Sequence, residues 1–125
     1  MKYIEYEYCV NCGRDAIDQH HCVFKSKVPA LRKCKHNLVY LCRECHYEIH
    51  HKSGKLDLKM KLRFQNYLES QWLKNSLTYD EIKETLDITD SNMRRLLKTC
   101  ITDKEGKYKR EDVIRTCMGG KLYKK

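Results

Sequence analysis

Proline and long apolar stretches are scarce in this chain, and acidic side chains are fewer than basic ones. Its 125 residues include one proline, Pro29, and no apolar run approaches the ~20 residues that a membrane-spanning helix requires. Residues 1–8 are polar and aromatic, without the charged and then apolar regions of a secretory signal. The sequence therefore predicts a cytoplasmic protein without membrane contact.

Acidic residues are outnumbered by basic ones. The chain has 26 lysines and arginines against 17 aspartates and glutamates, which gives a formal charge of +9 and a pI near 9.1. Such an excess favours an acidic polymer as partner, because basic side chains that contact phosphates release condensed counterions. Solubility is an alternative reason for part of this positive charge. A 15.1 kDa chain holds one ordinary domain or two very small ones. The core of a domain shorter than about 70 residues generally needs a stabilising cross-link such as a bound metal.

Half of the eight cysteines occur in two Cys-x-x-Cys pairs. Each pair can grip zinc from a tight turn, and two pairs complete a closed tetrahedral site, which is structural rather than catalytic. Two disulfides are the alternative, but a reduced cytosolic chain favours metal. The other cysteines lack pair spacing and are expected to be small buried side chains. The predicted zinc ligands are Cys9, Cys12, Cys42 and Cys45, and the isolated cysteines are Cys22, Cys34, Cys100 and Cys117.

The segment between and after these pairs predicts a strand, loop, strand and helix unit. Residues 16–24 end in β-favouring side chains and residues 37–41 are a second short apolar run, so both are expected to be strands. A polar, basic loop with Pro29 separates them. Residues 43–51 contain no helix breaker and predict a helix that stops near Ser53 and Gly54.

Four histidines in this unit suggest a second metal site. His46 and His50 are four positions apart, so a helix projects them from one face and they can share an ion. His20 can close a three-histidine set with open coordination positions, which distinguish a catalytic site from a structural one. His21 is then available as a base. A single His-x-x-x-His also arises by chance, and His36 and His51 have no assigned role.

The complete motif resembles a known family. It reads Cys9-x-x-Cys12, Asp18-x-His20-His21, Asn37-Leu38-Val39-x-Leu41-Cys42-x-x-Cys45-His46-x-x-x-His50. This string is similar to the zinc-containing branch of the HNH endonucleases, whose fold is the ββα-metal finger, or His-Me finger. The resemblance covers residues 9–51 and includes the colicin DNase type, which has its own double histidine and His-x-x-x-His helix.

The resemblance implies a role for each residue. His21 and Asn37 are the candidate catalytic residues: His21 would be the general base that activates water. Asn37 would tie down the loop between the strands, although the equivalent residue binds metal in other branches. His20, His46 and His50 would hold a divalent ion such as Mg²⁺ or Mn²⁺. Adjacent residues on a regular strand face opposite ways, so His20 and His21 serve one site only if the strand ends or bends there.

The remainder of the chain predicts helices and a DNA-binding region. Residues 55–76 are expected to form an amphipathic basic connecting helix, although residues 56–64 also alternate as a strand would. Thr78-x-x-Glu81 is a capping box that begins a helix through Leu86, and a second helix is expected over 91–99. This pair is similar to a helix-turn-helix, and the turn at 103–106 and the helix at 110–117 resemble an excisionase-type winged domain. The candidate DNA-binding residues are Asn92, Arg94, Arg95 and Lys98.

These patterns together predict an α+β, mostly helical protein. Residues 1–54 would be the HNH ββα-metal nuclease domain with its four-cysteine zinc site, and residues 77–125 the helix-turn-helix or winged region, with a helical packing extension as the plain alternative. The resemblance implies metal-dependent DNA nicking by a monomer of a phage or mobile-element type in the host cytoplasm, either beside phage packaging machinery or as a homing enzyme. The alternatives are a non-catalytic zinc-ribbon and helix-turn-helix regulator, and a dimeric double-strand-cutting nuclease.

Overall fold

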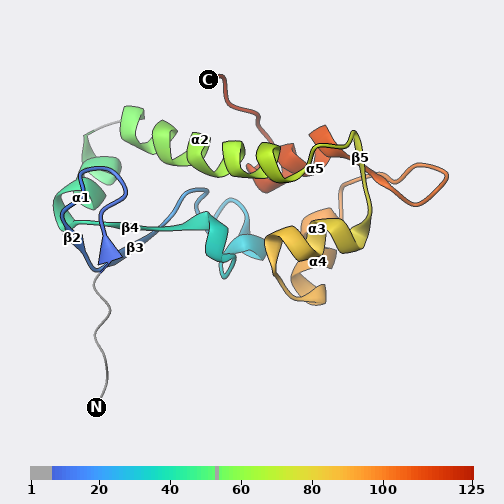
Figure 1. Cartoon of the computed structure of the whole chain (residues 1–125), viewed down its shortest axis with the longest axis horizontal. Helices are drawn as coiled ribbons and strands as arrows, with labels where there is room; N and C mark the ends of the chain where they lie inside the picture. Colours follow the sequence, from blue (N-terminus) through green and yellow to red (C-terminus); the bar gives the residue numbers. More distant parts are fainter. Residues whose placement is uncertain (1–6, 53) are drawn as a thin grey trace, which may run out of the picture.

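The long helix α2, Gly54–Gln71, runs along the middle of the molecule in the computed structural model (Figure 1), which describes residues 7–52 and 54–125. At one end lie the cysteine-bearing turns and helix α1, Arg43–His51, and at the other end lie the C-terminal helices. The protein is α+β and about 48% helical, as the sequence predicts. The described residues form three small two-stranded sheets.

Two antiparallel strand pairs build the N-terminal half. In the second pair, His20 lies opposite Val39 and His21 opposite Leu38, and helix α1 packs against both strands. The prediction of one strand over 16–24 is wrong in its extent, because the chain leaves the sheet after His21. The strands are β1 Glu7–Tyr8, paired with β2 Asp15–Ala16, and β3 Asp18–His21, paired with β4 Leu38–Leu41.

The loop between β3 and β4 is a folded part of the core. It contains two short 3₁₀ helices, η1 Pro29–Leu31 and η2 Lys35–Asn37. Val28, Ala30, Leu31 and Cys34 are buried in it. The loop therefore presents its apolar side chains to the rest of the protein and its basic ones to solvent.

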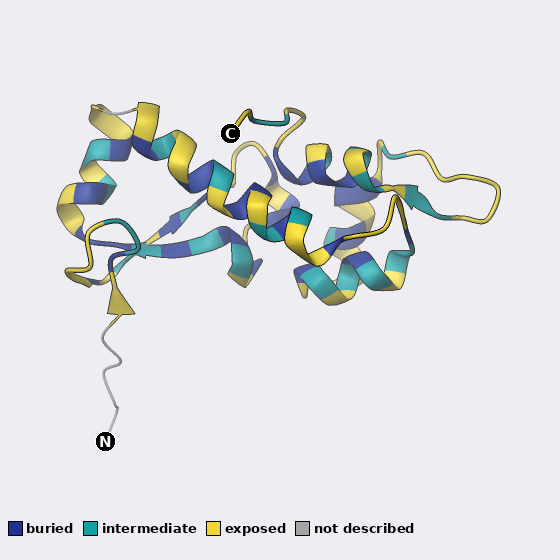
Figure 2. Cartoon of the chain, turned by 45° about the horizontal axis from the view of Figure 1, so that its top comes forward, coloured by how far each residue is buried: buried dark blue, intermediate teal, exposed yellow. Residues whose placement is uncertain are grey.

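Helix α2 resolves the ambiguity between helix and strand at residues 56–64. Leu56, Met60, Phe64 and Leu68 are buried at a spacing of four, whereas Leu58 is exposed. A period of four places one stripe of a helix against the core. A connecting helix is confirmed here, but its predicted extent to residue 76 is wrong, because α2 ends at Gln71 and Ser76 already belongs to a strand. Buried segments recur along α2 in Figure 2.

The C-terminal helices match their predicted signals closely. Thr78 and Glu81 make the reciprocal capping box at 3.1 Å in both directions. Thr89 caps the next helix, which begins at Asp90, and Asp87 turns the chain between the two helices with a left-handed φ of 52°. These elements are α3 Tyr79–Leu86, α4 Asp90–Leu97, α5 Arg110–Cys117, and the paired strands β5 Ser76–Leu77 and β6 Tyr108–Lys109.

One hydrophobic core joins the two halves. The buried face of α4, with Met93, Leu96 and Leu97, packs against η1, and the Cys34 thiol donates to the Leu86 carbonyl oxygen at 3.3 Å. Helix α5 packs against α2. The C-terminal region therefore holds the β3–β4 loop in place. Within the described residues, no helix is both long and apolar enough to cross a membrane.

Candidate metal centres

Four cysteines from two distant segments converge. One sulfur from each of the predicted zinc ligands lies within 4.8 Å of the others. The first Cys-x-x-Cys turn closes through the Gly13 N–H, which donates to the Cys9 carbonyl oxygen at 2.9 Å, and Gly13 has a φ of 81° that side chains rarely adopt. The second pair lies where β4 ends and α1 begins. The cluster consists of Cys9, Cys12, Cys42 and Cys45.

The thiols of this cluster fit a divalent cation. Burial raises the pKa of Cys9, but backbone hydrogen bonds, led by that from Cys42, outweigh it and bring the pKa to about 6. The Asn11 amide lowers the pKa of Cys45 through a 3.4 Å hydrogen bond, yet burial and the neighbouring thiols raise it to about 12. Four thiolates cannot share this space without a cation. A closed four-sulfur set suits structural zinc.

Three histidines form a second, separate cluster. Nitrogens of His20, His46 and His50 lie within 4.8 Å of one another, and the His46 Nε2 and His50 Nε2 atoms are 3.2 Å apart. His20 is buried, His46 is half-buried and His50 is exposed. The cluster is therefore closed on the protein side and open to solvent at His50, as a catalytic metal site requires.

The donor chemistry of this cluster fits a cation. Burial, followed by the nearby His46 and His50, lowers the pKa of His20 to about 4, so its ring is neutral at pH 7. The His20 Nε2 atom is buried and has no hydrogen-bond partner among the described residues. A buried polar atom without a partner is costly. A bound divalent ion would account for such a neutral, imidazole-lined cluster.

Asp18 positions His46 within this cluster. The Asp18 Oδ2 atom lies 3.3 Å from His46 Nδ1, and a carboxylate accepts, so Nδ1 carries the hydrogen and Nε2 keeps its lone pair toward His50. Such carboxylate partners fix the tautomer of metal-binding histidines. The sequence motif includes Asp18 but assigns it no role. The pairing of β3 with β4 places Asp18 beside α1 and reveals its contact with His46.

We expect Asp18→Asn to weaken Mn²⁺ binding by about 10- to 100-fold, which is the usual effect of removing a carboxylate partner of a ligating histidine. Titration calorimetry with Mn²⁺ on zinc-loaded protein measures this directly, without any activity assay. Asp15→Asn is the matched control, because Asp15 is exposed on β2 and outside both clusters. Equal Mn²⁺ affinity in both variants would remove Asp18 from this role.

His21 lies outside the histidine cluster, at the last position of β3. Its Nε2 atom is 2.9 Å from the Arg32 carbonyl oxygen. A carbonyl only accepts, so Nε2 carries the hydrogen and Nδ1 keeps the lone pair of a neutral ring. His21 also lines a hollow of about 440 Å³ with Lys25, Arg32 and Lys33. The strand end thus separates His20, which belongs to the histidine cluster, from His21, which faces a basic hollow.

Asn37 is fully buried and holds the β3–β4 loop. Its Oδ1 atom accepts from the Val23 N–H at 2.8 Å, and its Nδ2 atom donates to the carbonyl oxygens of Val23 at 3.0 Å and Leu31 at 3.4 Å. These bonds pull residues 22–24 out of the sheet, which explains why β3 ends at His21. Asn37 is outside both clusters and is fully buried, so its observed contacts are with the backbone of the loop that it positions.

The isolated cysteines and the remaining histidines lie outside both clusters. Burial raises the pKa of Cys22 to about 12, and it also raises the pKa of Cys34 and of Cys117. Cys100 is partly buried. His36 stacks on Tyr67 and His51 stacks on Tyr47. The expectation that the isolated cysteines are small buried side chains is confirmed for Cys22, Cys34 and Cys117.

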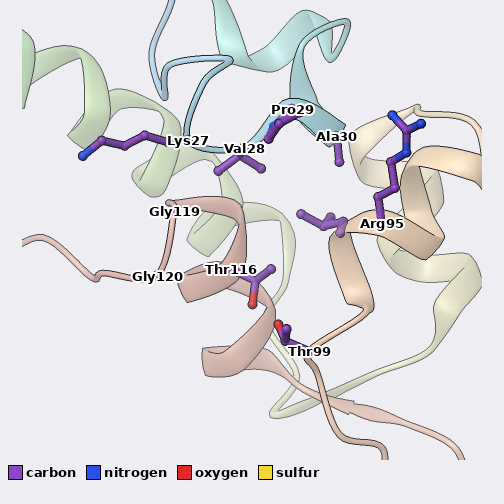
Figure 3. Close-up of a pocket in the computed structure, with 10 residues that line it drawn as sticks. Lys27, Val28, Pro29, Ala30, Arg95, Thr99, Thr116, Gly119 and Gly120 are labelled. Atoms are coloured by element: carbon purple, nitrogen blue, oxygen red, sulfur yellow. The ribbon is translucent and has the colours of Figure 1, made fainter.

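The candidate DNA-binding residues lie on the outer side of α4 and just after it. Arg94, Arg95 and Lys98 are exposed, and Asn92 is half-buried. Arg95 also borders an apolar hollow of about 370 Å³ at the junction of the β3–β4 loop with α4 and α5. Figure 3 shows the charged ends of Arg95 and Lys27 pointing away from this hollow. The hollow is a packing junction without a cluster of reactive groups.

Comparison of the chain with protein-family models, with curated proteins and with solved structures returns no match.

Proposed function

We propose that this protein is a metal-dependent DNA endonuclease of the HNH type, which hydrolyses a phosphodiester and nicks one strand. The proposal is carried by one observation. A closed four-sulfur cluster and a separate, solvent-open three-histidine cluster lie on one strand and helix unit, with a fourth histidine just outside the second cluster. The motif over residues 9–51 that resembles the HNH endonucleases includes every one of these residues.

His21 is suited to activate water. The hydrogen bond from Nε2 to the Arg32 carbonyl oxygen leaves the Nδ1 lone pair available, and a positioned imidazole can accept a proton from water. In the proposed reaction His21 takes a proton from water, the water oxygen bonds to phosphorus, and the bond from phosphorus to the 3′ oxygen breaks. The leaving 3′ oxygen keeps the bonding electrons and takes a proton from solvent water, so the products are a 5′-phosphate and a 3′-hydroxyl.

His20, His46 and His50 would hold the catalytic divalent cation, Mg²⁺, Mn²⁺ or a similar ion. When bound, such an ion neutralises charge on the reacting phosphate and stabilises the leaving oxygen. Asp18 orients His46, and the surrounding fold keeps the buried side of the cluster dry. Structural zinc on the four cysteines would fix the start of α1, from which both His46 and His50 project.

DNA is the proposed partner, supported by the charge of +9 and by the exposed basic side chains of α4. One histidine cluster would act on one phosphate at a time, so a monomer would nick one strand. A double-strand break would need two copies of the protein or two successive cleavage events. A role beside phage packaging machinery in a host cytoplasm follows from the family resemblance alone.

A non-catalytic regulator is the second candidate function. The α3–turn–α4 pair favours it, because its turn spans only residues 87–89 and its second helix has an exposed basic face. This geometry is typical of DNA-binding helix-turn-helix units. A regulator would contain zinc at the cysteines, and its histidines would be incidental.

Supercoiled plasmid separates the two functions. We expect the purified protein to convert it to the open-circular form when Mg²⁺ or Mn²⁺ is added, and to leave it intact without added ion. His46→Ala should abolish nicking and retain the four-cysteine zinc. His51→Ala is the matched control, since His51 lies on the same helix outside the cluster. Plasmid that stays supercoiled with every ion would favour the regulator.

A further inference from the structure

A continuous basic surface begins beside His21 and ends on α2. The hollow that contains His21 shares Leu38 with a second hollow of about 470 Å³ between η2, β4 and α2. The second shares Arg63 and Asn66 with a third hollow on the outside of α2. We call the cations that line these three hollows the basic tract: Lys25, Arg32, Lys33, Lys35, Lys55, Lys59 and Arg63.

Within residues 7–52 and 54–125, no carboxylate lines any of the three hollows. Among the same described residues, the ion pairs of the tract are limited to Lys35 with Asp87, at 3.8 Å. Lys59 donates to the neutral Asn11 side chain at 2.8 Å. By contrast, the hollow on the outer face of α1 is lined by two glutamates, Glu44 and Glu48, beside its two cations. The positive charge of the tract is therefore not compensated locally, unlike that of α1.

The cations of α2 are arranged in a row. Lys55, Lys59 and Arg63 are all exposed and are four positions apart. With a rise of about 1.5 Å per residue, the row extends over about 12 Å of one helix face. A row of this kind matches a repeating polyanion better than it matches a single small anion.

The aromatic side chains that line the middle hollow favour duplex over single-stranded DNA as the ligand. Tyr67 and His36 lie in the middle hollow, but their rings stack on each other at 4.3 Å and the Tyr67 hydroxyl bonds to His36 Nε2 at 3.0 Å. Single-strand binding uses exposed aromatic faces on which bases stack. Here one face of each ring is covered by the other ring, whereas the cations around the hollows are exposed, so charge is the main feature offered to a ligand.

We propose that the basic tract binds the phosphate backbone of duplex DNA and guides one strand past His21. The inference rests on the proposed nuclease function, and it assigns backbone binding to the β3–β4 loop and α2, which is a surface distinct from α4. Lys25, Arg32 and Lys33 would contact phosphates next to the reacting one. Lys55, Lys59 and Arg63 would contact phosphates farther along the duplex.

Duplex binding by the Lys33→Gln/Arg63→Gln protein tests this inference. Both side chains are exposed and lie in different hollows of the tract. We expect the dissociation constant for a labelled duplex to rise roughly tenfold at low salt, and the slope of log K against log salt to shrink by about 1.8, at ~0.9 for each phosphate that the variant no longer neutralises. Fluorescence anisotropy without added divalent ion measures both quantities. The Arg43→Gln/Lys52→Gln protein is the control, because it loses the same charge from the exposed outer face of α1.

Each outcome supports or overturns the proposal that the basic tract binds duplex DNA. Weak binding by the tract variant alone supports it. Equal weakening in both variants would show that net charge, and not this surface, binds DNA. Preference for a single strand of equal length, with loss of binding in Tyr67→Ala, would also overturn it. Because binding is measured without cleavage, a wild-type protein that binds but never nicks removes the nuclease proposal and leaves this test valid.

Discussion

Cys42→Ser is expected to lower the melting temperature sharply and to release the structural zinc. Cys42 contributes a sulfur to the four-thiol cluster, and its side chain also accepts from the Cys45 N–H at the start of α1. Zinc binding in small finger domains contributes ~10–16 kcal/mol to folding, whereas whole domains are stable by only ~5–15 kcal/mol. Losing one ligand releases the zinc, and the N-terminal half then loses a contribution comparable to the whole free energy of unfolding of a domain. Calorimetry and a colorimetric zinc assay measure the two effects.

Cys100→Ser is the matched control for this result. Cys100 lies outside the cluster, and a serine there keeps a hydroxyl within reach of Thr116 Oγ1, now 3.3 Å from the sulfur. We expect it to retain its zinc and to melt close to wild type. If Cys42→Ser matched wild type in both zinc content and melting temperature, the assignment of zinc to the four cysteines would be wrong.

His21→Ala should reduce nicking by ~10²- to 10⁴-fold, which is the typical cost of losing a positioned general base. His21 lies outside the histidine cluster, so the variant should bind Mn²⁺ as wild type does. The seven cations of the basic tract are unchanged, so duplex affinity should also be unchanged. Single-turnover cleavage of a labelled duplex at saturating Mn²⁺ measures the rate, and calorimetry measures the ion.

His50→Ala should behave differently, because it removes a member of the cluster. We expect it to lose Mn²⁺ affinity together with activity, while its zinc content stays normal. Should His21→Ala cut at the wild-type rate, or lose Mn²⁺ in the way expected of His50→Ala, the separate roles of His20 and His21 would be refuted.

Local signals predicted the helices well. The Thr78 and Glu81 capping box begins α3 as expected, and α1 and α5 have their predicted bounds. These signals are short in range, because a cap or a breaker acts within one turn of the chain. Strand lengths were less predictable. Val23 and Phe24 favour a strand by residue type, but the distant Asn37 side chain bonds the Val23 backbone and ends β3 at His21.

The sequence by itself determined which residues are candidates to bind metal. Spacing is enough for a Cys-x-x-Cys turn, and for His46 and His50 on one face of α1, because the backbone geometry of a turn or helix fixes distances between near neighbours. Only the tertiary structure decided how distant residues combine. Strand register brought Asp18 to His46, loop folding brought the Arg32 carbonyl to His21, and packing of the loop near α2 joined the basic tract. Such contacts depend on how buried faces fit together, which no local pattern encodes.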